Sequence, residues 1–128
     1  MPFADDVTAS RTFLVVDDEP FVREVLGEIL DVLGVEALLV SSGEEAIALL
    51  GSREAPLHGA LVDVRMPGIS GYTCVAALRR LRPGLACAVM SGLDAGEVSG
   101  ALPDGVRWLS KPFTVAEVRA LVGSLQAG

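Results

Sequence analysis

Five short apolar runs, each separated from the next by a segment with helical periodicity, constrain the fold of this chain more than any other feature. The runs are nearly continuous in apolar residues, which is typical of strands buried on both faces of a sheet. Strands that alternate with helices favour right-handed crossovers and a parallel sheet. We therefore predict a doubly wound α/β domain with helices on both faces of a five-stranded parallel sheet, its strands at residues 13–16, 37–40, 60–62, 86–90 and 106–109.

Capping residues predict where the intervening helices begin and end. Pro20 suits the first position of the helix after the first strand, and Gly34 suits the cap at its C-terminus. Ser42 and Thr114 each stand three residues before a glutamate, the capping-box pattern that opens a helix. Ser70 is expected to cap the N-terminus of a further helix.

The segment between the fourth and fifth strands fits a helix poorly. It contains Gly96 and Gly100, and each glycine inside a helix costs ~1 kcal/mol relative to alanine. Pro103 ends the segment. We predict that this helix, the fourth of the expected fold, is short, frayed or mobile.

The length and composition are those of one domain. Of the 128 residues 51% are hydrophobic, enough for a substantial core. We expect a flexible segment at residues 1–10 and a single domain at residues 11–128. Cys74 and Cys87 lie in a predicted helix and a predicted strand, so we interpret both as small core residues rather than a disulfide.

Charge and hydropathy exclude several function classes. The formal net charge of -7 and the lack of a basic run argue against direct nucleic-acid binding. No apolar stretch approaches the ~20 residues that a membrane span needs, so we expect no membrane insertion. The first residues lack the signal-peptide pattern of basic residues followed by an apolar run. We therefore predict a cytoplasmic protein.

Polar side chains of complementary chemistry follow three of the apolar runs. Asp17 and Asp18 follow the first run, Asp63 follows the third, and Lys111 comes shortly after the fifth. Because the carboxyl ends of parallel strands meet at one edge of the sheet, these side chains should share a pocket. Crowded carboxylates repel unless a cation lies among them, and Mg2+ prefers oxygen ligands. We therefore predict a Mg2+ site, with an unpaired Lys111 ammonium that can meet an incoming anion such as a phosphoryl group.

Four motifs, each directly after a predicted strand, resemble those of the receiver domain of two-component response regulators. They are Val16-Asp17-Asp18-Glu19, Asp63-Val64-Arg65-Met66-Pro67-Gly68 with Gly71, Met90-Ser91-Gly92 and Ser110-Lys111-Pro112-Phe113. Each motif alone is a weak signal, but the four in this order are highly specific. The resemblance covers roughly residues 11–125 and implies a flavodoxin-like sheet with the strand order 2-1-3-4-5.

The resemblance implies a cofactor and its ligands. Asp63 would be the phosphoacceptor, forming an acyl phosphate. Mg2+, or Mn2+ in its place, would be bound directly by Asp18, by Asp63 and by the backbone carbonyl of Arg65. Asp17 would assist through water.

The resemblance also implies how the phosphoryl group is held and sensed. Lys111 and Ser91 would contact its oxygens, and the Lys111-Pro112 peptide bond would be cis. Trp108 stands where the family usually has a tyrosine or phenylalanine that turns inward on activation. It is either a switch coupled to Ser91 or a tryptophan packed under the fourth helix.

The function implied is a phosphorylation-controlled signalling switch. A histidine kinase or a histidine phosphotransfer protein would donate the phosphoryl group, and an unidentified downstream protein would bind the changed surface. We expect no enzyme activity beyond self-phosphorylation from small donors and autodephosphorylation.

Two alternatives belong to other classes. One is a pseudo-receiver, an interaction module that never takes phosphate, and the complete set of polar residues argues against it. The other is an aspartate-nucleophile phosphohydrolase, which resembles this class but carries its nucleophile after the first strand with a second aspartate two residues on. The spacing here is Asp17-Asp18-Glu19, and the best nucleophile, Asp63, follows the third strand.

Overall fold

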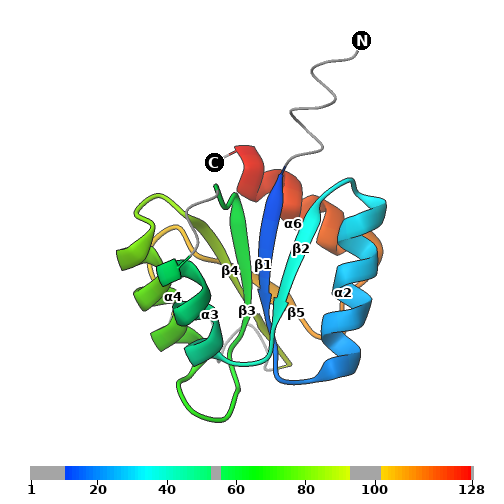
Figure 1. Cartoon of the computed structure of the whole chain (residues 1–128). Helices are drawn as coiled ribbons and strands as arrows, with labels where there is room; N and C mark the ends of the chain where they lie inside the picture. The colour runs from blue at the N-terminus through cyan, green and yellow to red at the C-terminus, as the bar shows by residue number, and fades with distance from the viewer. Residues whose placement is uncertain (1–10, 53–55, 93–101, 128) are drawn as a thin grey trace.

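The computed structural model of the chain describes residues 11–52, 56–92 and 102–127, which form a five-stranded parallel sheet flanked by helices (Figure 1). The strand order is β2-β1-β3-β4-β5. The elements are β1 (Thr12–Val16), α2 (Pro20–Val32), β2 (Glu36–Val40), α3 (Gly43–Ser52), β3 (Gly59–Asp63), α4 (Gly71–Leu81), β4 (Ala86–Ser91), β5 (Arg107–Ser110) and α6 (Val115–Ala127). The predicted fold class and strand order are confirmed, and each strand end lies within one residue of its prediction.

The sheet has a hydrophobic core on each face. Leu14 and Val16 of β1 belong to the core beneath α3 and α4, whereas Phe13 and Val15 belong to the core beneath α2 and α6. Every residue of β1 and of β3 is buried. This burial on both faces explains why these strands read as continuous apolar runs rather than as alternating patterns.

Helix α6 begins with the reciprocal capping box that the sequence predicts. The Glu117 N–H donates to Thr114 Oγ1 at 3.1 Å, and the Thr114 N–H donates to Glu117 Oε1 at 2.8 Å. The box predicted for α3 is only half correct. Ser42 Oγ accepts the Glu45 N–H at 3.0 Å, but the Glu45 carboxylate accepts the N–H of Ser41 at 2.7 Å, one residue earlier than predicted. The Ser41 hydroxyl donates to the same oxygen at 2.8 Å, which favours the shifted partner.

Both cysteines are buried and unpaired, as predicted. Burial raises the pKa of the Cys87 thiol to about 11, so this side chain stays protonated and acts as an apolar packing group.

Two other predictions, the flexible segment at residues 1–10 and the short or mobile helix over residues 93–101, lie outside the described residues. Across the described ranges, no helix combines the length and the apolar character that crossing a membrane requires.

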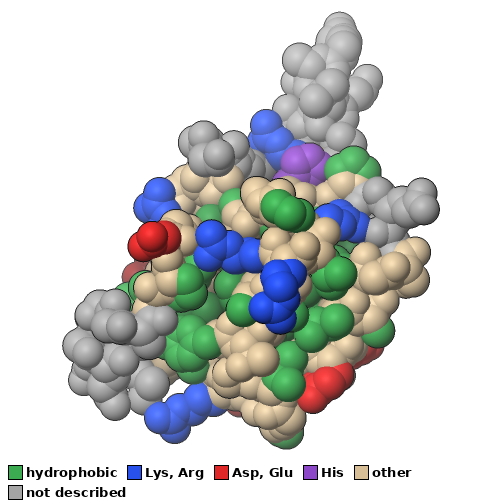
Figure 2. Space-filling view, turned by 90° about the vertical axis from the view of Figure 1, so that its left-hand side faces the viewer, with side chains coloured by type: hydrophobic (Ala, Val, Ile, Leu, Met, Phe, Trp, Pro, Cys, Tyr) green, Lys and Arg blue, Asp and Glu red, His purple; other side chains and the backbone are tan. Residues whose placement is uncertain are grey.

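Charge is unevenly spread over the surface. The face on the side of α4 shows basic side chains across its middle (Figure 2), although the net charge of the chain is -7. Helix α4 ends with Arg79 and Arg80 in its last turn. Cations at this position complement the partial negative charge of a helix C-terminus and stabilise the helix.

Gly71 brings the first turn of α4 against the end of β3. Its N–H donates to the Val64 carbonyl at 2.9 Å, and Ser70 caps the helix by accepting the Thr73 N–H at 3.2 Å. A Cβ at Gly71 would overlap the carbonyl oxygen of Asp63 and would lie 2.7 Å from Cα of Val64. These are backbone atoms, so any side chain here must displace the end of β3 that carries Asp63.

The substitution Gly71→Ala is therefore expected to lower the free energy of unfolding by about 1 to 3 kcal/mol through overpacking. The matched control is Gly51→Ala in α3, where nothing lies within 4 Å of the added Cβ. That change should be neutral or stabilising by up to about 1 kcal/mol, because alanine has the higher helix propensity. Urea denaturation of both variants measures the difference, and equal unfolding free energies would contradict the packing argument.

Candidate functional site

The carboxyl ends of β1, β3, β4 and β5 meet at one edge of the sheet, as parallel pairing requires. Val16 pairs with Val62, and Ser91 pairs with Ser110, so the residues that follow these positions lie side by side. A cavity of about 330 Å3 opens at this edge. Its lining is Asp18, Glu19, Asp63, Arg65, Ser91, Gly92 and Lys111.

Three carboxylates cluster at this cavity, hereafter the cleft. Asp17, Asp18 and Asp63 each offer one oxygen, and these oxygens all lie within 4.8 Å of one another. Asp17 is fully buried, and Asp63 is buried as well. Buried carboxylates beside a further carboxylate form a donor set that suits a hard divalent cation such as Mg2+.

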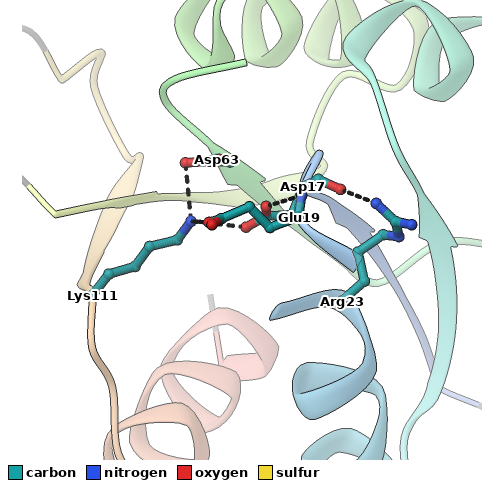
Figure 3. Close-up of polar contacts among 5 residues, drawn as sticks. All are labelled: Asp17, Glu19, Arg23, Asp63 and Lys111. Carbon is teal, nitrogen blue, oxygen red and sulfur yellow. Dashed lines mark hydrogen bonds and ion pairs between the residues drawn. The ribbon is translucent and has the colours of Figure 1, made fainter. Parts of the chain in front are cut away.

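Lys111 reaches the same cluster from the loop after β5 (Figure 3). Its Nζ lies 2.9 Å from Asp17 Oδ2, 3.4 Å from Asp63 Oδ1 and 3.4 Å from Glu19 Oε1. The prediction that this ammonium is unpaired is therefore wrong: Coulomb attraction in a partly buried cluster draws the long side chain onto the carboxylates. The predicted cis Lys111-Pro112 bond is confirmed.

The electrostatics of the cluster keep Lys111 charged. Burial disfavours its ammonium form, but hydrogen bonding and attraction to Asp17 and Asp63 outweigh burial and raise the pKa of Lys111. The Lys111 N–H also donates to the Ser91 carbonyl at 2.8 Å, which ties the loop to the end of β4. A charged donor is thus held at the cleft beside Asp63.

Asp63 is the most perturbed carboxyl group here. Burial, followed by the negative charge of Asp17, raises the pKa of Asp63 from 3.8 to about 6. Lys111 and a hydrogen bond from the backbone N–H of Arg65 act in the opposite direction but do not cancel the shift. The cluster therefore resists carrying its full negative charge, and an added cation would relieve that cost.

The structure gathers most of the predicted site residues. Asp18, Asp63, Arg65, Ser91 and Lys111 line the cleft, and Asp17 belongs to the adjoining carboxylate cluster.

Trp108 does not line the cleft. It lies on β5 opposite Val89 and packs partly buried against the core beneath α3 and α4. Its indole Nε1 is buried without a hydrogen-bond partner in the described part of the chain. Both interpretations of Trp108, as a switch and as a packed side chain, fit this placement.

Two residues that contact the cluster had no predicted role at the site. Glu19 pairs with Lys111, and the Arg23 guanidinium donates from Nη1 to the Asp17 carbonyl at 2.7 Å. Glu19 directly follows the two aspartates, and Arg23 lies one helical turn further on, so helical spacing is the signal that could have pointed to them.

Comparisons with known proteins agree on one family. A family model described as the response regulator receiver domain matches residues 13–123. The probable transcriptional regulatory protein TcrX of Mycobacterium tuberculosis is 34% identical over 109 residues, which is 84% of this chain and 46% of that protein. The chain spans less than half the length of the first curated relatives that it matches.

Solved structures agree with this assignment. A response regulator receiver protein from Sinorhizobium medicae superposes with a TM-score of 0.82 at 30% identity, covering 93% of this chain and 96% of that one. The response regulator TrrA from Thermotoga maritima, in complex with Mg(2+)-BeF, gives a TM-score of 0.77 at 29% identity, covering 90% and 98%.

The raised pKa of Asp63 predicts how stability depends on pH without metal. The carboxyl group keeps its proton to a higher pH in the folded state than in the unfolded state, so the contribution of Asp63 to stability falls as the pH rises from about 4 to about 6. The shift corresponds to about 2 to 3 kcal/mol. Asp63→Asn should therefore be more stable than the wild type by this order at pH 7.5 in EDTA, and nearly equal at pH 4.

Urea denaturation at the two pH values measures this difference. The control is Asp104→Asn, an exposed carboxylate near the amino end of β5. This variant removes one carboxylate outside the cleft, so it controls for the change in net charge alone. A stability gain for Asp63→Asn that does not grow with pH would contradict the electrostatic argument.

Proposed function

Because the chain belongs to the family of response regulator receiver domains, we propose that Asp63 accepts a phosphoryl group and that the chain acts as a phosphorylation-controlled switch. Receiver domains are signalling modules of two-component systems. The observation that carries the proposal is the Lys111 ammonium, held 3.4 Å from Asp63 Oδ1 beside two further carboxylates. A phosphoacceptor needs positive charge next to its attacking oxygen, and this arrangement supplies it.

We propose Mg2+, or Mn2+ in its place, as the cofactor. Receiver domains bind Mg2+ at an acidic pocket, and the three carboxylates within 4.8 Å form such a pocket here. Asp18 and Asp63 would be direct ligands with the backbone carbonyl of Arg65, and Asp17 would bind through water. The bound ion would neutralise charge on the phosphoryl oxygens.

Asp63, Lys111 and Ser91 would then each have a separate role in the phosphoryl transfer. A carboxylate oxygen of Asp63 forms a bond to phosphorus while the bond from phosphorus to the leaving group breaks. Lys111 exchanges a carboxylate partner for a phosphoryl oxygen, which needs little movement because its Nζ is already beside Asp63. Ser91, buried at the end of β4 and lining the same cleft, donates its hydroxyl to another oxygen.

Signalling would follow from a change at Ser91. If the phosphoryl group draws this hydroxyl inward, space opens next to β5 that the Trp108 ring can enter.

The phosphoryl donor would be a histidine kinase or a histidine phosphotransfer protein, and an unidentified downstream protein would bind the changed surface. Enzyme activity would be limited to self-phosphorylation from small donors and autodephosphorylation. The cytoplasmic location stays a prediction.

The first test is intact-mass spectrometry after incubation with acetyl phosphate and Mg2+. The wild type should gain one phosphoryl adduct that EDTA abolishes, and Asp63→Asn should gain none, because the amide cannot attack phosphorus. The control Asp104→Asn removes a distant carboxylate and should be phosphorylated like the wild type. An adduct that persists in Asp63→Asn would exclude Asp63 as the acceptor. No adduct, with no binding of beryllofluoride, would favour the pseudo-receiver instead.

The second test uses the fact that Trp108 is the only tryptophan. Its fluorescence should change when Mg2+ and beryllofluoride, a phosphoryl mimic, bind to the wild type. The change should be smaller in Ser91→Ala, which lacks the hydroxyl that would couple the phosphoryl group to the ring. Unchanged emission in a wild type shown by mass to be phosphorylated would leave Trp108 as a packed side chain.

A further inference from the structure

Glu19 places a fourth carboxylate at the mouth of the cleft. Its Oε1 lies 3.4 Å from Lys111 Nζ, and its side chain keeps 61% of its surface exposed (Figure 3). An ion pair this exposed contributes at most about 1 kcal/mol to stability. What Glu19 supplies is therefore mainly charge at the entrance to the site.

Hydrogen bonds place the backbone of Glu19 beside the cleft. The Glu19 N–H donates to Asp17 Oδ1 at 2.9 Å, and the Glu19 carbonyl accepts the N–H of Arg23 at 3.1 Å. Arg23 in turn donates from its guanidinium to the Asp17 carbonyl. Glu19 is thus the N-cap residue of α2, held by bonds on both sides. These bonds fix the backbone of Glu19 beside the cleft, and its side chain reaches Lys111 from there.

The balance of charge at the cleft makes this carboxylate significant. The charged side chains that line the cleft or contact the adjoining cluster are four carboxylates, those of Asp17, Asp18, Glu19 and Asp63, and three cations, those of Arg23, Arg65 and Lys111. A bound Mg2+ would bring their formal sum to +1. Without Glu19 the sum would be +2, and the more positive site would attract anions more strongly.

Resting on the proposed phosphoryl transfer to Asp63, we propose that Glu19 is a specificity-determining residue for the phosphodonor. Its carboxylate disfavours fully ionised small donors relative to donors whose leaving nitrogen carries a proton. Acetyl phosphate, a dianion at neutral pH, represents the first class. Phosphoramidate, a net monoanion with a protonated nitrogen, represents the second class and shares its phosphorus–nitrogen bond with phosphohistidine.

The two transfers differ only in the leaving group. In both, an Asp63 carboxylate oxygen forms the new bond to phosphorus. With acetyl phosphate the bond from phosphorus to the acyl oxygen breaks, and acetate leaves with the electron pair. With phosphoramidate the phosphorus–nitrogen bond breaks, and the protonated nitrogen leaves as ammonia. The donors therefore probe the same attack with different charge on the incoming molecule.

The experiment compares Glu19→Gln with the wild type, using each donor at saturating Mg2+ and pH 7.5. The measured quantity is the ratio of the second-order rate constant for acetyl phosphate to that for phosphoramidate, from quenched intact-mass samples. Glu19 Oε1 and Asp63 Oδ1 each lie 3.4 Å from Lys111 Nζ, which bounds the distance between the two oxygens. A unit charge at a separation of roughly 7 Å, in partly hydrated surroundings, changes this ratio by about three- to sevenfold. Glu19→Gln should raise the ratio by that factor, and the increase should shrink at high salt because exposed charges are screened.

The matched control is Glu24→Gln. Glu24 is an exposed glutamate of the same helix that lines a different hollow with Gly27 and Glu28, so the variant changes the net charge of the chain equally. Its ratio should equal that of the wild type. Efficient phosphorylation with an unchanged ratio in Glu19→Gln, or an equal change in Glu24→Gln, would overturn the role of Glu19 and leave the proposed function intact. A wild type that takes a phosphoryl group from neither donor would overturn both.

Discussion

Mutual repulsion among three carboxylates is the interaction on which the rest of the site depends. Asp17, Asp18 and Asp63 place one oxygen each within 4.8 Å of the others. At an effective dielectric constant of ~20, two unit charges at this distance repel by about 3 kcal/mol. The cluster therefore gains from any cation that it can bind, and in the chain itself that cation is Lys111.

The fold can impose this arrangement because the strands that carry it cannot move apart. β1 and β3 are adjacent, fully buried and covered by a core on each face. The turn after β1 is fixed by the hydrogen bonds of Glu19 and Arg23 to Asp17, and the end of β3 is closely packed against Gly71. Hydrophobic burial thus stabilises a local geometry that electrostatics opposes, which is common where a site must bind charged ligands.

The fold and the identity of the clustered residues could be predicted from the sequence because both follow from the pattern along single strands. Continuous apolar runs indicate buried parallel strands, and the carboxyl ends of such strands meet at one edge. Asp17, Asp18 and Asp63 needed no further information, whereas Ser91 was predicted from the resemblance of its motif. The partners of Lys111 could not be predicted, because they depend on which carboxylates a long side chain can reach after the loop has folded. The raised pKa of Asp63 likewise depends on burial and on distances that the spacing of residues along the sequence does not determine.

The glutamate of the α3 capping box contacts Ser41 rather than Ser42 for a similar reason, since a hydroxyl and an N–H of one residue together bind the carboxylate.

Competition for Lys111 connects these observations. Its ammonium is shared by Asp17, Asp63 and Glu19, so no single carboxylate is fully neutralised by it. An incoming phosphoryl oxygen would compete with the same carboxylates for this donor, while a divalent cation would compete with Lys111 for the carboxylates. The cation would thus weaken the carboxylate contacts that compete with the phosphoryl oxygen for Lys111, and the phosphoryl group would weaken the Lys111 contacts that compete with the cation for the carboxylates. Each ligand would therefore raise the affinity of the site for the other, as positive coupling between two ligands requires. Under the proposed function, the crowded cluster of the ligand-free protein, rather than any single residue, would make the site selective for a metal and a phosphoryl group bound at once.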